Sequence, residues 1–234
     1  TIFSQVLAQE WVYEILAVDD YSSDRSYPIL QELANADPRI RIFHHSINRG
    51  KGAAIRTAIP HCHAPFVLIQ DADLEYNPQE YADLLEPLLD GKADVVFGSR
   101  FLTSRSRRVL YYWHAVVNQY LTWLTNMISN INLTDMETCY KVFRREVVQA
   151  LVLHENRFGF EPEVTIKVAR MGCRIYEVGI SYSGRTNEEG KKIRAKDGIR
   201  ALWCLFKYGI TARHFTLPPQ PGISFDQDSS KSNE

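Results

Sequence analysis

Short apolar runs alternate with stretches of helical periodicity along the first half of the chain. The apolar runs predict strands at residues 12–18, 40–44, 65–70 and 93–97, with a further one at 174–178. The helical patterns between them cover residues 25–36, 50–59 and 78–89. This alternation predicts an α/β fold in which a mostly parallel central sheet is flanked by helices in a Rossmann-like arrangement.

After Gly98 the pattern changes to longer helices, one of which runs from residue 158 to about residue 171. Residues 217–234 are rich in Pro, Gly, Ser, Asp and Gln, a composition typical of disordered segments. We therefore expect a single domain over residues 1–216 and a disordered tail over residues 217–234.

The composition argues against some classes of protein. With 234 residues, of which 45% are hydrophobic, the chain can bury a sizeable core, and its net charge of −1 gives no field that would attract nucleic acid. The four cysteines are scattered without a CxxC pair, which favours a reducing, cytoplasmic compartment. Residues 109–133 carry no charged side chain, but polar residues interrupt them, so we do not expect this stretch to span a membrane.

The most informative polar residues follow the apolar run at 65–70. Asp71 and Asp73 come directly after it, and Glu75 stands two residues further on. Such a run reads as a strand buried on both faces, and carboxylates at its end would reach the edge of the sheet where α/β folds bind ligands. Oxygen ligands there suit a divalent cation shared with a diphosphate. The alternative is a solvated turn that caps the helix opened by Pro78.

Other strand ends carry charged residues as well. Asp19 and Asp20 close the first predicted strand, where a carboxylate can accept hydrogen bonds from a nucleobase or a ribose, or can cap a turn. Lys51 lies in a glycine-rich turn before a helix, a place that attracts anions. Arg100 follows the strand at 93–97, where it would bind a phosphate or pair with a carboxylate such as Asp71.

Two later segments have both a functional and a structural interpretation. The loop at 182–193, with Arg185, Lys191 and Lys192, either closes over phosphates as a lid or is a solvated loop of mixed charge. Glu161 and Glu163 either favour the dipole of the helix they open, or one of them faces the ligand crevice.

A basic and then aromatic segment follows the strand at 93–97. Arginines at 105, 107 and 108 precede a helix rich in Tyr and Trp. This order suits contact with a membrane surface, and a core helix that covers the sheet explains it equally well.

The order of these motifs is more specific than any motif alone. Asp-Asp-x-Ser-x-Asp at 19–24 precedes Asn-Arg-Gly-Lys-Gly at 48–52, Asp-Ala-Asp at 71–73, Gly-Ser-Arg at 98–100, Phe-Glu-Pro-Glu at 160–163 and Arg-x-x-x-Glu-Gly-Lys-Lys at 185–192. This series resembles family 2 glycosyltransferases of the GT-A fold. Within them it is most similar to the dolichol- and polyprenol-phosphate mannose or glucose synthases.

The resemblance implies an inverting, metal-dependent hexosyltransferase that uses Mg²⁺ or Mn²⁺. The donor would be a nucleotide-diphosphate sugar, GDP-mannose or UDP-glucose, and the acceptor a polyprenyl or dolichyl phosphate. The protein would then lie on the cytoplasmic face of the membrane as a peripheral protein, with a membrane subunit as a further partner and no role for nucleic acid.

The resemblance also assigns roles to individual residues. Asp71, Asp73 and Glu75 would hold the metal, with Asp73, Arg185 and Lys191 as the catalytic residues. The remaining donor-binding residues would be Asp19, Asp20, Lys51, Asp71, Arg100 and Lys192.

Two departures from the family pattern leave alternatives open. Residues 1–9 look like the helix after the family's first strand, so we expect that strand to be missing and the domain to be N-terminally truncated. Tyr21 stands where the family usually has glycine, which predicts either strain in that turn or an altered base pocket. The alternatives are transfer to a sugar or lipid hydroxyl, with Glu161 or Glu163 as the base, and an inactive truncated paralogue.

Overall fold

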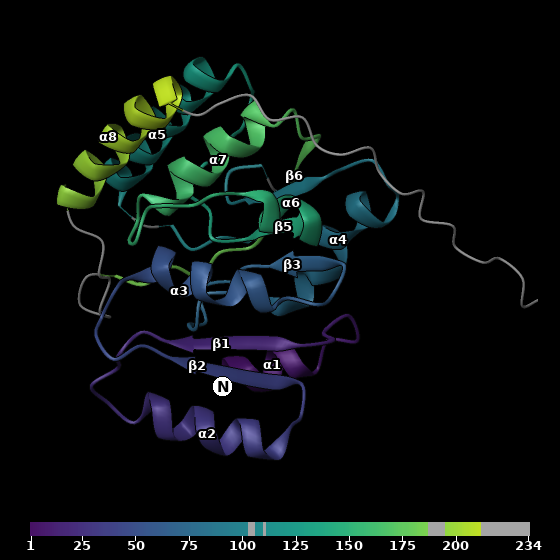
Figure 1. Ribbon diagram of the computed structural model, residues 1–234. Helices are drawn as coiled ribbons and strands as arrows, with labels where there is room; N and C mark the ends of the chain where they lie inside the picture. Colours follow the sequence, from purple (N-terminus) through teal and green to yellow (C-terminus); the bar gives the residue numbers. More distant parts are fainter. Residues whose placement is uncertain (103–105, 110, 187–194, 212–234) are drawn as a thin grey trace, which may run out of the picture.

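A computed structural model describes residues 1–102, 106–109, 111–186 and 195–211 of the chain (Figure 1). The predicted tail at 217–234 lies outside these residues, as do Lys191 and Lys192.

The described strands form two sheets. β1 (Ile15–Asp19) and β2 (Ile40–His44) pair in parallel. The second sheet has the order β3-β5-β4-β6. Its strands are β3 (Phe66–Leu68), β5 (Lys141–Arg144), β4 (Val95–Ser99) and β6 (Ile175–Gly179). β4 and β6 are parallel, and β5 runs antiparallel to both of its neighbours. The predicted α/β class is therefore confirmed. The larger sheet is mixed because β5, which the sequence pattern did not predict, runs antiparallel within it.

β3 differs from the predicted central strand buried on both faces. It is three residues long, lies at an edge of its sheet, and all three residues are partly exposed. Its other edge has no paired strand among the described residues. The apolar run at 65–70 nevertheless packs against the main core, in which Ile69 is buried.

The predicted helices at 25–36, 50–59 and 78–89 are present, the last as a 3₁₀ turn (Pro78–Glu80) followed by a helix. Asn77 caps that turn by accepting a hydrogen bond from the amide of Gln79. The α-helices are α1 (Ile2–Leu7), α2 (Ser26–Ala36), α3 (Lys51–Ala58), α4 (Tyr81–Leu89), α5 (Tyr112–Ser129), α6 (Arg145–Ala150), α7 (Phe160–Arg170) and α8 (Ala195–Thr211).

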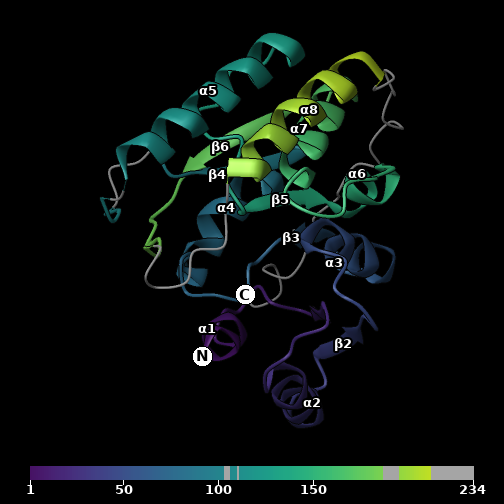
Figure 2. The same cartoon turned by 90° about the vertical axis from the view of Figure 1, so that its left-hand side faces the viewer.

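The main core surrounds β4, whose residues are all buried. Val96 and Phe97 are completely inaccessible and pack in one cluster with Leu88 of α4, Phe143 of β5 and Val164 of α7. Each such side chain contributes about 1.5–3 kcal/mol of burial free energy. A second cluster joins α5, α7 and α8, which lie side by side in Figures 1 and 2. The loops that follow the strands therefore begin at residues that the packed core holds in place.

Within the described part of the chain, no helix combines the length and apolar character that a membrane crossing requires.

Candidate active site

Charged side chains from several elements meet beyond the end of β3. Lys51 opens α3, and Arg185 follows β6, 112 residues after Asp73 in the chain. Asp71, Asp73 and Glu75 lie in the loop after β3. The structure therefore brings together the predicted residues Lys51, Asp71, Asp73, Glu75 and Arg185.

Lys51 bridges two carboxylates. Its Nζ lies 3.1 Å from Asp71 Oδ1 and 2.9 Å from Glu161 Oε1. Burial alone would lower the pKa of Lys51, but the neighbouring Cys139, Glu161 and Asp71 raise it well above its usual value. Lys51 is therefore a permanent cation that holds Asp71 in place.

The second cation is Arg185, which binds the other two carboxylates. Its guanidinium donates to Asp73 Oδ2 at 2.6 Å and to Glu75 Oε1 at 2.8 Å. Glu75 also accepts the backbone amide of Arg185 at 2.9 Å and the hydroxyl of Tyr182 at 3.0 Å. Both carboxylate oxygens of Glu75, which the resemblance places at the metal, are thus engaged by the segment after β6.

The electrostatics of these carboxylates differ. Burial and the negative charges of Glu75 and Asp71 raise the pKa of Asp73. The pKa of Glu75 is lowered, because hydrogen bonds from Arg185 and Tyr182 outweigh the effect of burial. Asp73 thus lies in a field of neighbouring negative charge, which a bound cation would relieve.

The donor chemistry of this loop fits a hard divalent cation. Asp71 and Asp73 offer carboxylate oxygens, and their side chains are 32% and 22% exposed. Within the described residues, no three His, Cys, Asp or Glu side chains are close enough to hold a metal by themselves. A cation at Asp71 and Asp73 would therefore need further oxygen ligands, such as those of a diphosphate.

Asp20 shapes the glycine turn before α3. Its carboxylate lies 2.7 Å from His45 Nδ1 and accepts the amides of Arg49 at 2.8 Å and Gly50 at 2.6 Å. Gly50 has a φ of +98°, and a Cβ there would lie 2.5 Å from the carbonyl oxygen of Asn156. Asp20 and Gly50 together set the position of Lys51 at the start of the helix.

Asp19 is buried and serves the neighbouring turn. Its Oδ2 accepts the amide of Ser22 at 3.2 Å and lies 2.9 Å from His44 Nδ1. Burial would raise the pKa of Asp19, but hydrogen bonds from Ser22 and His44 lower it. Tyr21, within this turn, has a φ of +62° in the left-handed region. Backbone strain is therefore found in the turn for which the sequence predicts it.

Arg100 pairs with a carboxylate that the sequence did not suggest. Its guanidinium donates to both oxygens of Asp135, at 2.6 and 2.7 Å, rather than to Asp71 or Asp73. It also lies over the ring of Tyr182, 5.1 Å from the ring centre. Asp135 is fully buried, so this pair fixes the segment between α5 and β5 against the end of β4.

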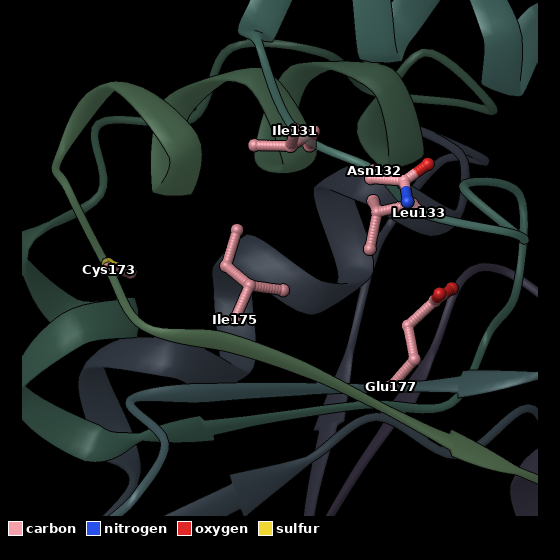
Figure 3. Close-up of a pocket in the computed structure, with 6 residues that line it drawn as sticks. All are labelled: Ile131, Asn132, Leu133, Cys173, Ile175 and Glu177. Carbon is pink, nitrogen blue, oxygen red and sulfur yellow. The ribbon is translucent and has the colours of Figure 1, made fainter.

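A hollow beside this pair is separate from the charged loop after β3. It is lined by Ile131, Asn132, Leu133, Cys173, Ile175 and Glu177 (Figure 3). In Figure 3 the Glu177 side chain rises from β6 toward the segment with Asn132 and Leu133. Its Oε1 accepts the backbone amides of Thr134 at 2.9 Å and Asp135 at 3.2 Å. The carboxylate in this hollow therefore binds the backbone of Asp135, whose side chain binds Arg100.

The two glutamates that open α7 have different surroundings. Glu163 is fully buried and accepts the backbone amides of His154 at 2.8 Å and Glu155 at 2.7 Å, together with the ammonium of Lys167. Glu161 binds Lys51 through one oxygen, while its other oxygen is buried with no hydrogen-bond partner in the structure. Glu163 has a structural role, and Glu161 belongs to the site.

Some residues of the site were missed from the sequence. Glu137 has a buried oxygen without a partner, and burial together with the charge of Glu161 raises its pKa to about 8. Tyr182 links Glu75 to Arg100, and Cys139 lies near Lys51. No motif marks these residues, because their contacts cross between elements that are distant in the sequence.

A model of glycosyl transferase family 2 matches residues 2–152. The polyprenol monophosphomannose synthase of Mycolicibacterium smegmatis is 28% identical over 85% of this chain and 77% of the relative. The undecaprenyl-phosphate mannosyltransferase of Micrococcus luteus is 27% identical over 90% of this chain and 88% of the relative. A dolichyl-phosphate beta-glucosyltransferase of Trichomonas vaginalis is 25% identical over 88% of this chain, and the match covers 64% of that relative.

Solved structures also resemble the fold. The glucosyl-3-phosphoglycerate synthase of Mycobacterium tuberculosis, solved with Mn²⁺, UDP and phosphoglyceric acid, superposes with a TM-score of 0.63 at 17% identity. The match covers 84% of this chain and 67% of that one. The same enzyme with Mn²⁺ and UDP-glucose gives a TM-score of 0.61. These likenesses confirm the predicted GT-A-type α/β fold.

Proposed function

This chain belongs to glycosyl transferase family 2, and from this premise we propose that it transfers a hexose from a nucleotide-diphosphate sugar to a polyprenyl phosphate. The observation that carries the proposal is the pair Asp71 and Asp73 at the end of β3, held between Lys51 and Arg185. Two carboxylates beside two cations suit a diphosphate bound with a divalent metal. The named relatives that use polyprenol, undecaprenyl and dolichyl phosphates support the choice of acceptor.

Asp71 and Asp73 are the residues that would hold Mg²⁺ or Mn²⁺. When bound, the cation would neutralise charge on the leaving diphosphate. The M. tuberculosis synthase, solved with Mn²⁺ and UDP-glucose, supports a divalent metal in this fold. Lys51 keeps Asp71 oriented, and Asp20 fixes the turn from which Lys51 extends.

The side chains of the protein would act on the two phosphate groups. Arg185 places positive charge beside Asp73, where it would serve both the leaving diphosphate and the acceptor phosphate. An oxygen of the acceptor phosphate would bond to the anomeric carbon as the bond to the donor diphosphate breaks, which inverts the configuration. The predicted lid residues Lys191 and Lys192 would add charge to the same step.

A phosphate acceptor also agrees with the surroundings of the glutamates. A phosphate is already anionic and needs no general base, whereas a hydroxyl acceptor does. Glu163 is occupied by two backbone amides and Lys167, so it is unsuited to remove a proton. One observation favours a hydroxyl acceptor as the second candidate, namely the unpartnered oxygen of Glu161.

A radiolabelled transfer assay tests this proposal. The full chain is incubated with GDP-mannose or UDP-glucose and with either polyprenyl phosphate or free polyprenol, with Mn²⁺ or with EDTA. We expect transfer to the phosphate alone, abolished by EDTA and reduced by roughly a thousandfold in Asp71→Asn/Asp73→Asn. The control is Asp37→Asn, which removes an ion pair with Arg39 outside the site.

Each other result has a defined meaning. Metal-dependent transfer that survives in the double variant contradicts the assignment of Asp71 and Asp73. Transfer to the free alcohol that Glu161→Gln abolishes supports the second candidate. If the chain neither transfers sugar nor binds UDP or GDP, it is an inactive member of the family.

A further inference from the structure

α5 and α8 expose an apolar stripe each. Apart from Tyr112 at the start of α5, the exposed large apolar residues of each helix recur every three or four positions, so they lie along one side. On α5 and α8 these residues are Trp113, Val117, Tyr120, Trp123, Met127, Ile199, Trp203, Phe206 and Ile210. Trp113 is 73% exposed and Ile210 is 85% exposed. We call these nine residues the α5–α8 face.

The two stripes belong to neighbouring helices. α5 and α8 pack against each other, and the chain of α8 comes so close at Gly209 that a Cβ there would lie 2.5 Å from Ile128. Figure 2 shows the two helices next to each other along the same edge of the molecule. Leu121 and Leu205 point the other way, into the cluster that holds the helices to α7. The residues of the α5–α8 face are therefore not part of the core that packs these two helices against α7.

The composition of this face separates it from an ordinary helix surface. α5 carries no Asp, Glu, Lys or Arg over its length, Tyr112–Ser129. Charged residues normally fill the outer side of a surface helix, and contiguous apolar patches of this kind mark interaction sites. The tryptophans and tyrosines among its residues are the side chains that concentrate at the boundary between lipid and water.

The face begins beside the proposed catalytic loop. Arg107, just before α5, forms a parallel bridge with Tyr182, and the amide of Arg108 donates to the Tyr182 carbonyl at 2.8 Å. Tyr182 stands three residues before Arg185. Arg107 and Arg108 are exposed at this end, so positive charge adjoins the apolar surface where it meets the site.

We infer that the α5–α8 face docks on a lipid bilayer that contains anionic headgroups. Aromatic and aliphatic side chains would enter the boundary of the bilayer, and Arg107 and Arg108 would meet its phosphates. This orientation rests on the proposed function in one respect, because it brings the lipid phosphate acceptor to Arg185. The binding itself needs neither donor nor acceptor.

Flotation with vesicles tests the inference. The full chain is mixed with vesicles of phosphatidylcholine alone or of phosphatidylcholine with phosphatidylglycerol, both without polyprenyl phosphate. We expect binding to the anionic vesicles that falls roughly tenfold or more in Trp113→Gln/Trp203→Gln. The matched control is Tyr13→Gln/Val152→Gln, which replaces residues that are 74% and 69% exposed outside α5 and α8, and it should bind like the wild type.

A second readout separates this inference from the proposed function. Transfer to a short-chain, water-soluble prenyl phosphate should be unchanged in Trp113→Gln/Trp203→Gln, whereas transfer to polyprenyl phosphate in vesicles should fall. Vesicle binding without any transfer would sustain the docking surface and refute the proposed activity. Equal vesicle binding by the variant and the wild type would overturn the docking surface. So would a dimer in light scattering that the variant abolishes, since the face would then join two copies of the chain.

Discussion

Glu75 connects the loop after β3 to the segment after β6. Its carboxylate accepts hydrogen bonds from Tyr182 and Arg185, and its backbone carbonyl accepts the amide of Ser183 at 2.9 Å. These contacts fix the segment from which Arg185 reaches Asp73. At the scale of the residue, Glu75 therefore positions the guanidinium of Arg185.

We predict that Glu75→Ala raises the KM for the acceptor phosphate about tenfold, because Arg185 loses two charge-assisted hydrogen bonds. The apparent affinity for Mn²⁺ should change little, which titration of activity with Mn²⁺ measures. Glu75→Gln keeps an acceptor oxygen and should restore part of the KM effect. A large loss of Mn²⁺ affinity in both variants would show instead that Glu75 ligates the metal.

Single residues of the site were partly predictable from the sequence. Asp71, Asp73 and Lys51 stand next to strand and helix ends, and such ends meet at one edge of an α/β fold. The partner of Arg100 was not predictable, because Asp135 is 35 positions away in a segment without a motif. Local sequence patterns predict which side chains lie at a sheet edge. Which of these side chains form ion pairs depends on the paths of the loops, and local patterns do not contain that information.

At the scale of elements, α8 is anchored to the loop before α7 through one buried carboxylate. Glu155 accepts hydrogen bonds from Arg200 at 2.6 Å, Tyr208 at 2.8 Å and Lys207 at 3.1 Å. Burial would raise the pKa of Glu155, but these hydrogen bonds lower it to about 2. The same loop contacts α3, since a Cβ at Gly52 would lie 2.3 Å from the Glu155 carbonyl.

We predict that Glu155 contributes to stability in an acid-sensitive way. Its pKa is lower in the folded chain than the value of about 4.3 in an unfolded one, so its contribution is complete above that value. The contribution is lost as the pH falls from about 4.3 to about 2. Urea unfolding of Glu155→Gln should show lower stability at pH 7 and a shallower decline below pH 5. Parallel pH profiles for variant and wild type would contradict this role.

β5 shows why one element was missed. Lys141 and Arg144 stand at its two ends, so only Val142 and Phe143 between them are apolar, yet both charged side chains are buried. Burial lowers the pKa of Lys141 to about 8, and its ammonium donates to the carbonyls of Met136 and Thr138. Arg144 donates to the carbonyl of Ala93 at 3.2 Å. Apolar periodicity predicts β4 easily, but it cannot predict a strand whose end residues are buried cations held by backbone carbonyls and, for Arg144, by Asp94.

At the scale of the whole molecule, ligand binding should couple to global stability, because the site draws residues from both halves of the fold. We predict that UDP or GDP with Mn²⁺ raises the melting temperature by roughly 5–10 °C at about a hundredfold excess over Kd. EDTA should reverse the shift, and Asp71→Asn/Asp73→Asn should show none. Differential scanning calorimetry measures all three, and the absence of any shift with both nucleotides would contradict donor binding.

The α/β class follows from alternating strands and helices, whereas the mixed sheet and the exposed faces of α5 and α8 do not. A helical period shows which residues share one side of a helix, but not whether another element covers that side. For α5 the sequence left core and membrane contact open. The exposure of Trp113 and Trp123 decides against a core role for that side of the helix.

The contact between Arg185 and Asp73 also bears on synthesis of the chain at the ribosome. The family match ends at residue 152, so a nascent chain of that length already holds Asp71, Asp73 and Lys51. It still lacks Glu161, which pairs with Lys51, and Arg185, which pairs with Asp73. Such a nascent chain holds Asp71 with its cation Lys51, but it leaves Asp73 without Arg185. Competence to bind a sugar nucleotide would then arise late in translation, when the segment after β6 has left the exit tunnel and folded back onto the carboxylates.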